Sequence, residues 1–185
     1  MYEVEVKLPA DHDAIRSRLA ELDAESLGTV TQRDTYYDAP HRSFAETDEA
    51  LRIRRIYRTE HEGSDDASPD ETRLTYKGPR VDARSKTRRE HETRVDDDGT
   101  MAELLGALGF EPAAVVEKQR TSYRVDGYTV TLDTVTDVGD YVEVETESED
   151  IDRARTGAFA LLADLGLDPD DQVRTSYLDL LLDDD

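Results

Sequence analysis

At 185 residues, the chain is long enough for one domain with a sizeable core, and its 45 acidic against 23 basic residues give a formal net charge of −22. This charge disfavours binding to nucleic acid or to an anionic membrane, and the absence of cysteine excludes disulfides and thiolate metal sites. No apolar run reaches membrane-spanning length and the N-terminus has no signal-peptide pattern, so we expect a cytoplasmic protein.

The basic residues are unevenly chosen, because only Lys7, Lys77, Lys86 and Lys118 are lysines. Such acidity with so little lysine indicates adaptation to very high salt, so we expect a halophilic protein. Three of the four lysines fall on strand-like segments beside other charges. We interpret them as positions that need a compact ammonium group, either to contact a phosphate or to lose a proton.

The first predicted strand spans residues 2–8, where apolar and charged residues alternate strictly. One face carries Glu3, Glu5 and Lys7, spaced about 7 Å apart along the strand. Carboxylate oxygens are ligands that Mg²⁺ and Mn²⁺ prefer, and a lysine beside them suits a phosphate. Taken alone, a half-buried strand with solvated charges is the simpler interpretation.

The rest of the chain reads as strands joined mostly by turns, with few helices. Asp11 is placed to cap a helix on which Ile15, Leu19 and Leu22 recur at helical spacing. The pair at 126–127, Asp-Gly, predicts a hairpin turn, and the charged segment 60–71 predicts an exposed loop. Further strands are expected at 29–38, 51–58, 72–77, 86–95, 113–125, 128–135 and 138–147, and further helices at 99–108, 152–165 and 175–182. This pattern predicts an α+β protein, an antiparallel barrel or strongly curved sheet of about eight strands with helices packed outside.

Most predicted strands offer one charged face of mixed sign and one apolar face. The charged faces carry Arg52 and Arg54, Thr75 and Lys77, Arg88 with Glu90 and Glu92, Lys118 and Arg120, Asp133, and Glu143 and Glu145. Two arrangements fit: a one-sided sheet whose charges point to water, or a barrel whose lumen they line. A lumen crowded with cations is too costly unless an anion fills it, and its carboxylates would need a divalent cation. The second arrangement therefore describes a site for a metal-bound polyphosphate.

Several short motifs match those of one family in the same order. The first is Glu3-Val4-Glu5-Val6-Lys7, of the form ExExK; the others are Gln32 to Asp38, Leu51 to Arg54, Leu74 to Pro79, Arg88 to Glu90, Lys118 to Arg120, Leu132-Asp133, Gly139 to Glu145 and Ser176-Tyr177. On these motifs the chain resembles the CYTH superfamily, the triphosphate tunnel metalloenzymes that include class IV adenylyl cyclases and thiamine triphosphatase. The resemblance covers essentially the whole chain, so residues 1–185 are expected to form a single CYTH-like tunnel domain.

The resemblance implies an eight-stranded antiparallel β-barrel, the triphosphate tunnel, with charged residues lining it. It implies that one or two Mg²⁺ or Mn²⁺ ions are held by Glu3, Glu5, Asp133, Glu143 and Glu145. It also implies that the triphosphate is bound by Lys7, Arg52, Arg54, Lys77, Arg88, Lys118, Arg120 and, from the C-terminal segment, Arg174. Arg88 is chosen over Arg89 from the Arg-x-Glu spacing. Lys7 and Glu5 are the candidate catalytic residues, and Lys7 is either a base or only a phosphate ligand.

Three functions remain open. The first is hydrolysis of a triphosphate, whether tripolyphosphate, thiamine triphosphate or a nucleotide such as ATP. The second is a class IV-type adenylyl cyclase that converts ATP to cyclic AMP and pyrophosphate, and the third is a non-catalytic module that binds polyphosphate or nucleotide. We rank hydrolysis first because bacterial class IV cyclases tend to carry a His-Phe pair before ExExK, whereas only Met1 and Tyr2 precede Glu3 here. Relatives of this kind are commonly homodimers, so a homodimer is compatible with the resemblance.

Overall fold

The computed structural model describes residues 1–58 and 68–183, and within these ranges nine strands form one antiparallel sheet. The strands are β1 Tyr2–Pro9, β2 Glu25–Asp38, β3 Ala50–Arg58, β4 Glu71–Lys77, β5 Lys86–Arg88, β6 Glu90–Arg94, β7 Glu111–Val125, β8 Tyr128–Val135 and β9 Gly139–Ser148. The helices are α1 His12–Glu21, α2 Phe44–Thr47, α3 Asp98–Ala107, α4 Ile151–Asp164 and α5 Tyr177–Asp183, with a 3₁₀ turn, η2, at Pro169–Asp171.

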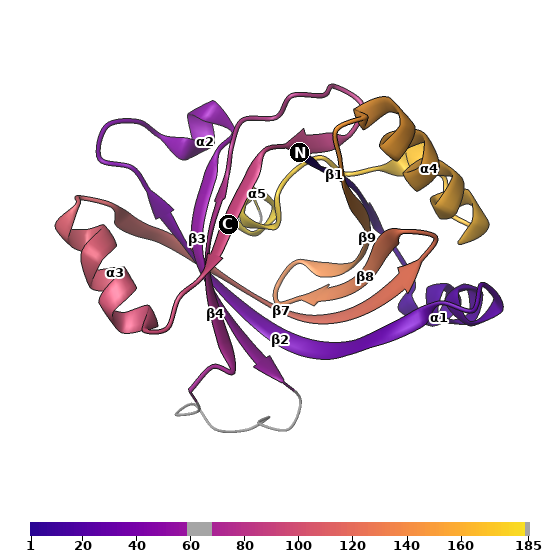
Figure 1. Ribbon diagram of the computed structural model, residues 1–185, viewed down its shortest axis with the longest axis horizontal. Helices are drawn as coiled ribbons and strands as arrows, with labels where there is room; N and C mark the ends of the chain where they lie inside the picture. Colours follow the sequence, from indigo (N-terminus) through magenta and orange to yellow (C-terminus); the bar gives the residue numbers. More distant parts are fainter. Residues whose placement is uncertain (59–67, 184–185) are drawn as a thin grey trace.

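The sheet closes into a barrel through the segment that contains β5 and β6. The order of strands is β5-β1-β9-β8-β7-β2-β3-β4-β6, so β5 and β6 lie at opposite ends of the sheet. Only Arg89 separates them in the chain: β5 pairs with β1 and β6 pairs with β4. One bent segment therefore joins the two edges, and the ring of strands is seen end-on in Figure 1. The predicted barrel is confirmed, while the strand count is nine instead of eight because the strand expected at 86–95 changes partners at Arg89.

The helices cover the apolar outer face of the barrel on two sides. Ile15 and Leu19 of α1 and Leu162 of α4 pack in one core against outward-facing valines and leucines of β1, β8 and β9. On the opposite side, Leu105 of α3 packs over β2 and β3 (Figure 1). The alternation predicted from the sequence is therefore confirmed, with apolar side chains outside under helices and charged side chains inside. The alternative of a one-sided sheet with solvated charges is wrong.

Local signals in the sequence account for several element ends. The Asp11 side chain caps α1 by accepting from the backbone N–H groups of Asp13 and Ala14, as predicted. Asp126 and Gly127 adopt φ values of 50° and 82° in the hairpin between β7 and β8, which is the left-handed conformation that this turn requires. The predicted loop at 60–71 falls mostly outside the described residues, and its last residue, Glu71, begins β4.

The C-terminal helix α5 differs from the other helices because it lies within the ring of strands (Figure 1). Its Tyr177 joins a small core with Tyr36, Val116 and Val135, and Leu178 and Leu181 pack against this core. None of the helices in the described part of the chain is long and apolar enough to cross a membrane.

Candidate functional site

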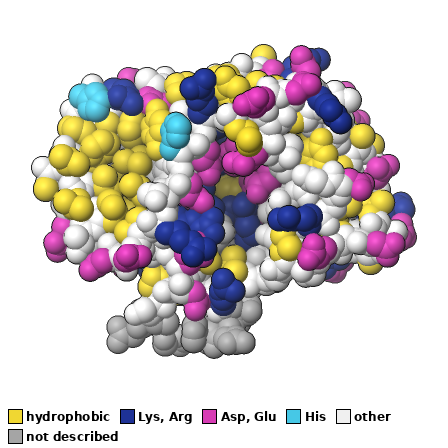
Figure 2. Space-filling model, in the orientation of Figure 1, with side chains coloured by type: hydrophobic (Ala, Val, Ile, Leu, Met, Phe, Trp, Pro, Cys, Tyr) yellow, Lys and Arg dark blue, Asp and Glu magenta, His cyan; other side chains and the backbone are white. Residues whose placement is uncertain are grey.

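A cavity of about 390 Å³ lies inside the barrel and is hollowed between charged side chains. In Figure 2 the centre of the molecule shows basic and acidic side chains together in this hollow. The basic lining residues are Arg52, Arg54, Arg73, Lys77, Lys86, Arg88, Lys118 and Arg120, and the acidic ones include Glu3, Glu5, Glu90, Glu92, Glu143 and Glu145. Most of the residues that the sequence analysis placed on charged strand faces are thus gathered in one space.

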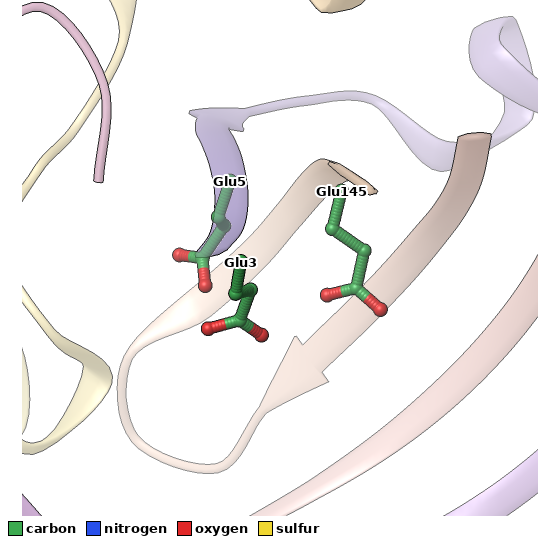
Figure 3. A group of neighbouring side chains, drawn as sticks. All are labelled: Glu3, Glu5 and Glu145. Carbon is green, nitrogen blue, oxygen red and sulfur yellow. The ribbon is translucent and has the colours of Figure 1, made fainter. Parts of the chain in front are cut away.

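Three carboxylates converge on one wall of this cavity. Glu3 and Glu5 are two residues apart on β1, and Glu145 lies opposite Glu5 on β9, so all three point to the same side (Figure 3). Each offers a carboxylate oxygen within 4.8 Å of the others. The Oε1 atom of Glu5 is buried and makes no hydrogen bond with any described residue. Burial, with the carboxylates of Glu3 and Glu143 nearby and against the opposing effect of Arg120, raises the pKa of Glu145 to about 7. Three close carboxylates, one of them with a buried oxygen that accepts no hydrogen bond from the described residues, fit a hard divalent cation.

The other two carboxylates expected as metal ligands, Asp133 and Glu143, face cations of the protein itself. Asp133 accepts from Nε and Nη2 of Arg120 at 2.7 and 2.6 Å and from Nζ of Lys118 at 2.9 Å. Glu143 accepts from the same Nη2 of Arg120. Burial alone would raise the pKa of Asp133 and of Glu143, but Arg120 and Lys118 hold both below their ordinary values. In this structure Asp133 and Glu143 therefore orient cations of the protein. They do not belong to the group of three carboxylates that converge.

The guanidinium groups of Arg52 and Arg54 are held by a residue absent from the predicted site, Asp34. Its carboxylate accepts from Nε and Nη2 of Arg54 at 2.7 and 2.6 Å and from Nη1 of Arg52 at 3.3 Å. Burial by itself would raise the pKa of Asp34, but the two arginines hold it well below its usual range. Asp34 faces Arg54 across the pairing of β2 with β3. Period-2 alternation places Asp34 and Gln32 on the inward face of β2, so the signal was present in the sequence.

Lys77, Lys86 and Arg88 complete the basic walls, each beside an acidic group. Lys77 Nζ lies 2.6 Å from Glu3 and 2.8 Å from Glu90, and Lys86 Nζ lies 3.5 Å from Glu5 Oε1. Arg88 Nη2 lies 3.1 Å from the carboxylate of Asp48. The neighbouring Arg89 lies outside, where its guanidinium stacks over the Tyr2 ring. The structure thus places Arg88 in the cavity and Arg89 on the surface.

Lys7 and Arg174 lie away from the lining. Lys7 is 1% exposed, and its Nζ donates to the backbone oxygen of Thr175 at 2.5 Å. Burial, together with the ammonium of Lys86, lowers the pKa of Lys7 to about 8. Arg174 is exposed and donates to the backbone oxygen of Ala83, so the structure does not bring it to the cavity.

All four lysines of the chain belong to this interior, although only Lys7, Lys77 and Lys118 were predicted in the site. The exposed fractions of their side chains are 14% for Lys77, 12% for Lys86 and 4% for Lys118, with Lys7 the most buried. Lys86 lies two residues before Arg88 on the same strand face, so alternation could have found it. In a chain that otherwise uses arginine, three of the four lysines line the cavity and the fourth, Lys7, is buried inside the barrel.

Comparisons with known proteins agree with this architecture. A family model described as CYTH domain matches residues 1–177. A protein of Methanocaldococcus jannaschii, named as a candidate adenylate cyclase, is 32% identical over 184 residues, which are 97% of this chain and 98% of that protein. An Aeromonas hydrophila protein named adenylate cyclase is 29% identical over 152 residues, covering 80% of this chain and 71% of that protein. A solved structure from Pyrococcus horikoshii superposes with a TM-score of 0.85 at 38% identity and covers 99% of both chains.

Proposed function

Since the chain belongs to the CYTH domain family, as its motifs predicted, we propose that it is a divalent-metal-dependent enzyme that hydrolyses a triphosphate inside the barrel. One observation carries the proposal: the carboxylates of Glu3, Glu5 and Glu145 converge within 4.8 Å in the cavity that the basic residues line. A cation site beside an anion site is what a metal-bound polyphosphate requires.

The charge pairs of the cavity support joint binding of metal and triphosphate. Glu3 accepts from Lys77, and Glu5 faces Lys86, so carboxylates and ammonium groups neutralise one another across the wall. If a metal bound the carboxylate alone, or a phosphate bound the ammonium group alone, the other member of the pair would be left buried without a counter-charge, which is costly. A divalent cation and a triphosphate bound together would give both groups new partners. We therefore expect tripolyphosphate to bind far more tightly with Mg²⁺ or Mn²⁺ than without either ion.

The arginines supply the anion-binding part of the mechanism. Asp34 holds Arg54 and Asp133 holds Arg120 through two-point contacts, so both guanidinium groups are oriented before a ligand arrives. Preorganised donors aimed at phosphate oxygens stabilise the charge that develops during phosphoryl transfer. A metal bound to Glu3, Glu5 and Glu145 would supply further charge neutralisation on the phosphates.

Lys7 is a candidate base or phosphate ligand, and its lowered pKa suits either role. Arginine keeps the positive charge but does not release its proton. Loss of turnover with retained tripolyphosphate affinity in Lys7→Arg would assign the base, and loss of affinity would assign the phosphate ligand.

The second candidate function is cyclisation of ATP to cyclic AMP and pyrophosphate. It is favoured by the names of the two relatives, one a candidate adenylate cyclase and the other an adenylate cyclase. Hydrolysis and cyclisation require the same binding of metal and triphosphate. They differ in the attacking group, which is water in hydrolysis and the ribose 3′-hydroxyl in cyclisation.

Product analysis separates the candidates. ATP, thiamine triphosphate and tripolyphosphate are offered separately with Mg²⁺ or Mn²⁺ at high KCl. Orthophosphate without cyclic AMP supports the hydrolase, and cyclic AMP with pyrophosphate supports the cyclase. Binding without any product would replace both with a polyphosphate- or nucleotide-binding role.

The metal site is tested by a matched pair of variants. Glu5→Gln should lose metal-dependent turnover and keep the fold, because it removes one charge from the three converging carboxylates. Glu117→Gln, an exposed position next to the inward-facing Lys118 on β7, should behave as the unaltered protein. Full activity in Glu5→Gln would exclude Glu5 from the metal site.

A further inference from the structure

Tyr177, the first residue of α5, lies within cation–π distance of two lysines of the site. The centroid of its ring is 4.1 Å from Nζ of Lys7 and 4.8 Å from Nζ of Lys118. Both distances fall inside the range of about 6 Å over which an aromatic face attracts a cation. Tyr177 itself lines the cavity. One aromatic ring thus connects a lysine of β1 with a lysine of β7.

The position of this ring is set by contacts that do not involve the lysines. Tyr141 meets it edge to face at a centroid distance of 5.3 Å, and Val116 and Val135 pack in the same small core. The start of α5 is fixed by Ser176, whose Oγ donates to the Asp179 carboxylate at 2.6 Å and accepts from the Asp179 N–H at 3.0 Å. The ring and the backbone of Tyr177 are therefore held in place by contacts other than those with the two ammonium groups.

The face of the Tyr177 ring is a further attractive partner of both ammonium groups. They are buried near each other, and each has one hydrogen-bond acceptor within the described residues: Thr175 O for Lys7 and Asp133 for Lys118. A further carboxylate would hold them but would also neutralise them and compete with a phosphate. The face of a ring attracts an ammonium group without adding a negative charge.

We propose that Tyr177 is a positioning residue, whose ring face holds the ammonium groups of Lys7 and Lys118 in the orientation that a triphosphate requires. The inference rests on the proposed function for the identity of that ligand. The hydroxyl of Tyr177 is buried and makes no hydrogen bond with the described residues, so the ring carries the role. Tyr177→Phe should therefore keep the positioning role. Tyr177→Leu should lose it, because leucine is apolar but has no ring.

The contact can be measured without metal or substrate, because the chain has only four lysines. In protein labelled with ¹³C-lysine, the ε-CH₂ signals are assigned by single Lys→Arg variants. We expect ring-current shifts for Lys7 and Lys118 relative to Lys77 and Lys86. The shift of Lys118 should persist in Tyr177→Phe and disappear in Tyr177→Leu. An unshifted Lys118 signal in the unaltered protein would overturn the proposal even if the leucine variant failed to fold.

The role in binding is measured by calorimetry of tripolyphosphate with Mg²⁺ at high KCl. Loss of the ring face beside both lysines should weaken binding about tenfold in Tyr177→Leu, which corresponds to about 1.4 kcal/mol. Tyr177→Phe should stay within about twofold, and Leu181→Ala, which trims the same small core, should lower the melting temperature without changing affinity. Equal affinity in the leucine and phenylalanine variants refutes positioning. If the unaltered protein binds no tripolyphosphate, the proposed function fails and so does the ligand named here, while the lysine shifts still report on the ring contact.

Discussion

Replacing Asp34 with asparagine should markedly lower the free energy of unfolding of the protein. The Asp34 side chain is 2% exposed and meets Arg54 at 2.6 Å and Arg52 at 3.3 Å. Asparagine keeps the shape but leaves two buried guanidinium groups without their counter-charge. Removing one partner of a buried ion pair costs about 3–5 kcal/mol. We expect this loss in the free energy of unfolding, measured by urea denaturation at fixed KCl.

The pH dependence gives a second measure of the same pair. The arginines hold the pKa of Asp34 below the ordinary value of 3.8, although burial opposes them. A carboxyl group with a depressed folded-state pKa contributes stability that is fully present above the unfolded-state pKa and is lost as pH falls through the folded-state pKa. Below about pH 4, the unaltered protein should therefore lose stability more steeply than Asp34→Asn.

The control is Asp13→Asn, because Asp13 pairs with Arg16 on the surface, where the aspartate side chain is 95% exposed. Exposed pairs contribute little, so we expect a change within about 0.5 kcal/mol. A loss in Asp34→Asn as small as in this control would refute the assignment of Asp34 as the residue that holds the two arginines.

Three further outcomes are expected. A Cβ on Gly157 would lie 2.0 Å from Tyr128 Oη, so Gly157→Ala should lower the free energy of unfolding by about 1–3 kcal/mol, measured by thermal unfolding. Gly106→Ala, with nothing within 4 Å of the new Cβ, should be neutral or stabilising. Equal effects of the two substitutions would contradict the close packing at Gly157. Because the pKa of Glu145 is raised to about 7, its proton must leave before a metal binds. Mn²⁺ affinity should therefore rise with pH through about 7, and an affinity independent of pH would argue against Glu145 as a ligand. With a net charge of −22, the protein should unfold more easily in dilute buffer than in molar KCl; equal stability in both would remove the halophilic interpretation.

The inward faces of the strands could be predicted from the sequence because side-chain direction alternates along a strand. Alternation alone placed Arg52 and Arg54, Lys77, and Lys118 on charged faces, and the cavity lining contains them. It also favoured Arg88 over Arg89. The motifs predicted the family, and they did so from residues spread over the whole chain.

Which side chains face one another inside the barrel could not be predicted from alternation. Asp133 and Glu143 alternate inward like Glu145, yet they face Arg120, whereas Glu145 faces Glu3 and Glu5. Likewise, no periodicity shows that Lys7 meets Thr175, a residue 168 positions away. The closing role of β5 and β6 depends on the same long-range pairing, since each half of the segment pairs with a different edge of the sheet.

The sequence by itself determined most of the strands, their charged faces and the family, because these follow from local spacing and residue type. Only the tertiary structure decided which carboxylates converge, which ones orient arginines, and that the Tyr177 ring lies beside Lys7 and Lys118. Those choices depend on strand register, barrel closure and the placement of α5 inside the ring, which bring together residues far apart in the chain.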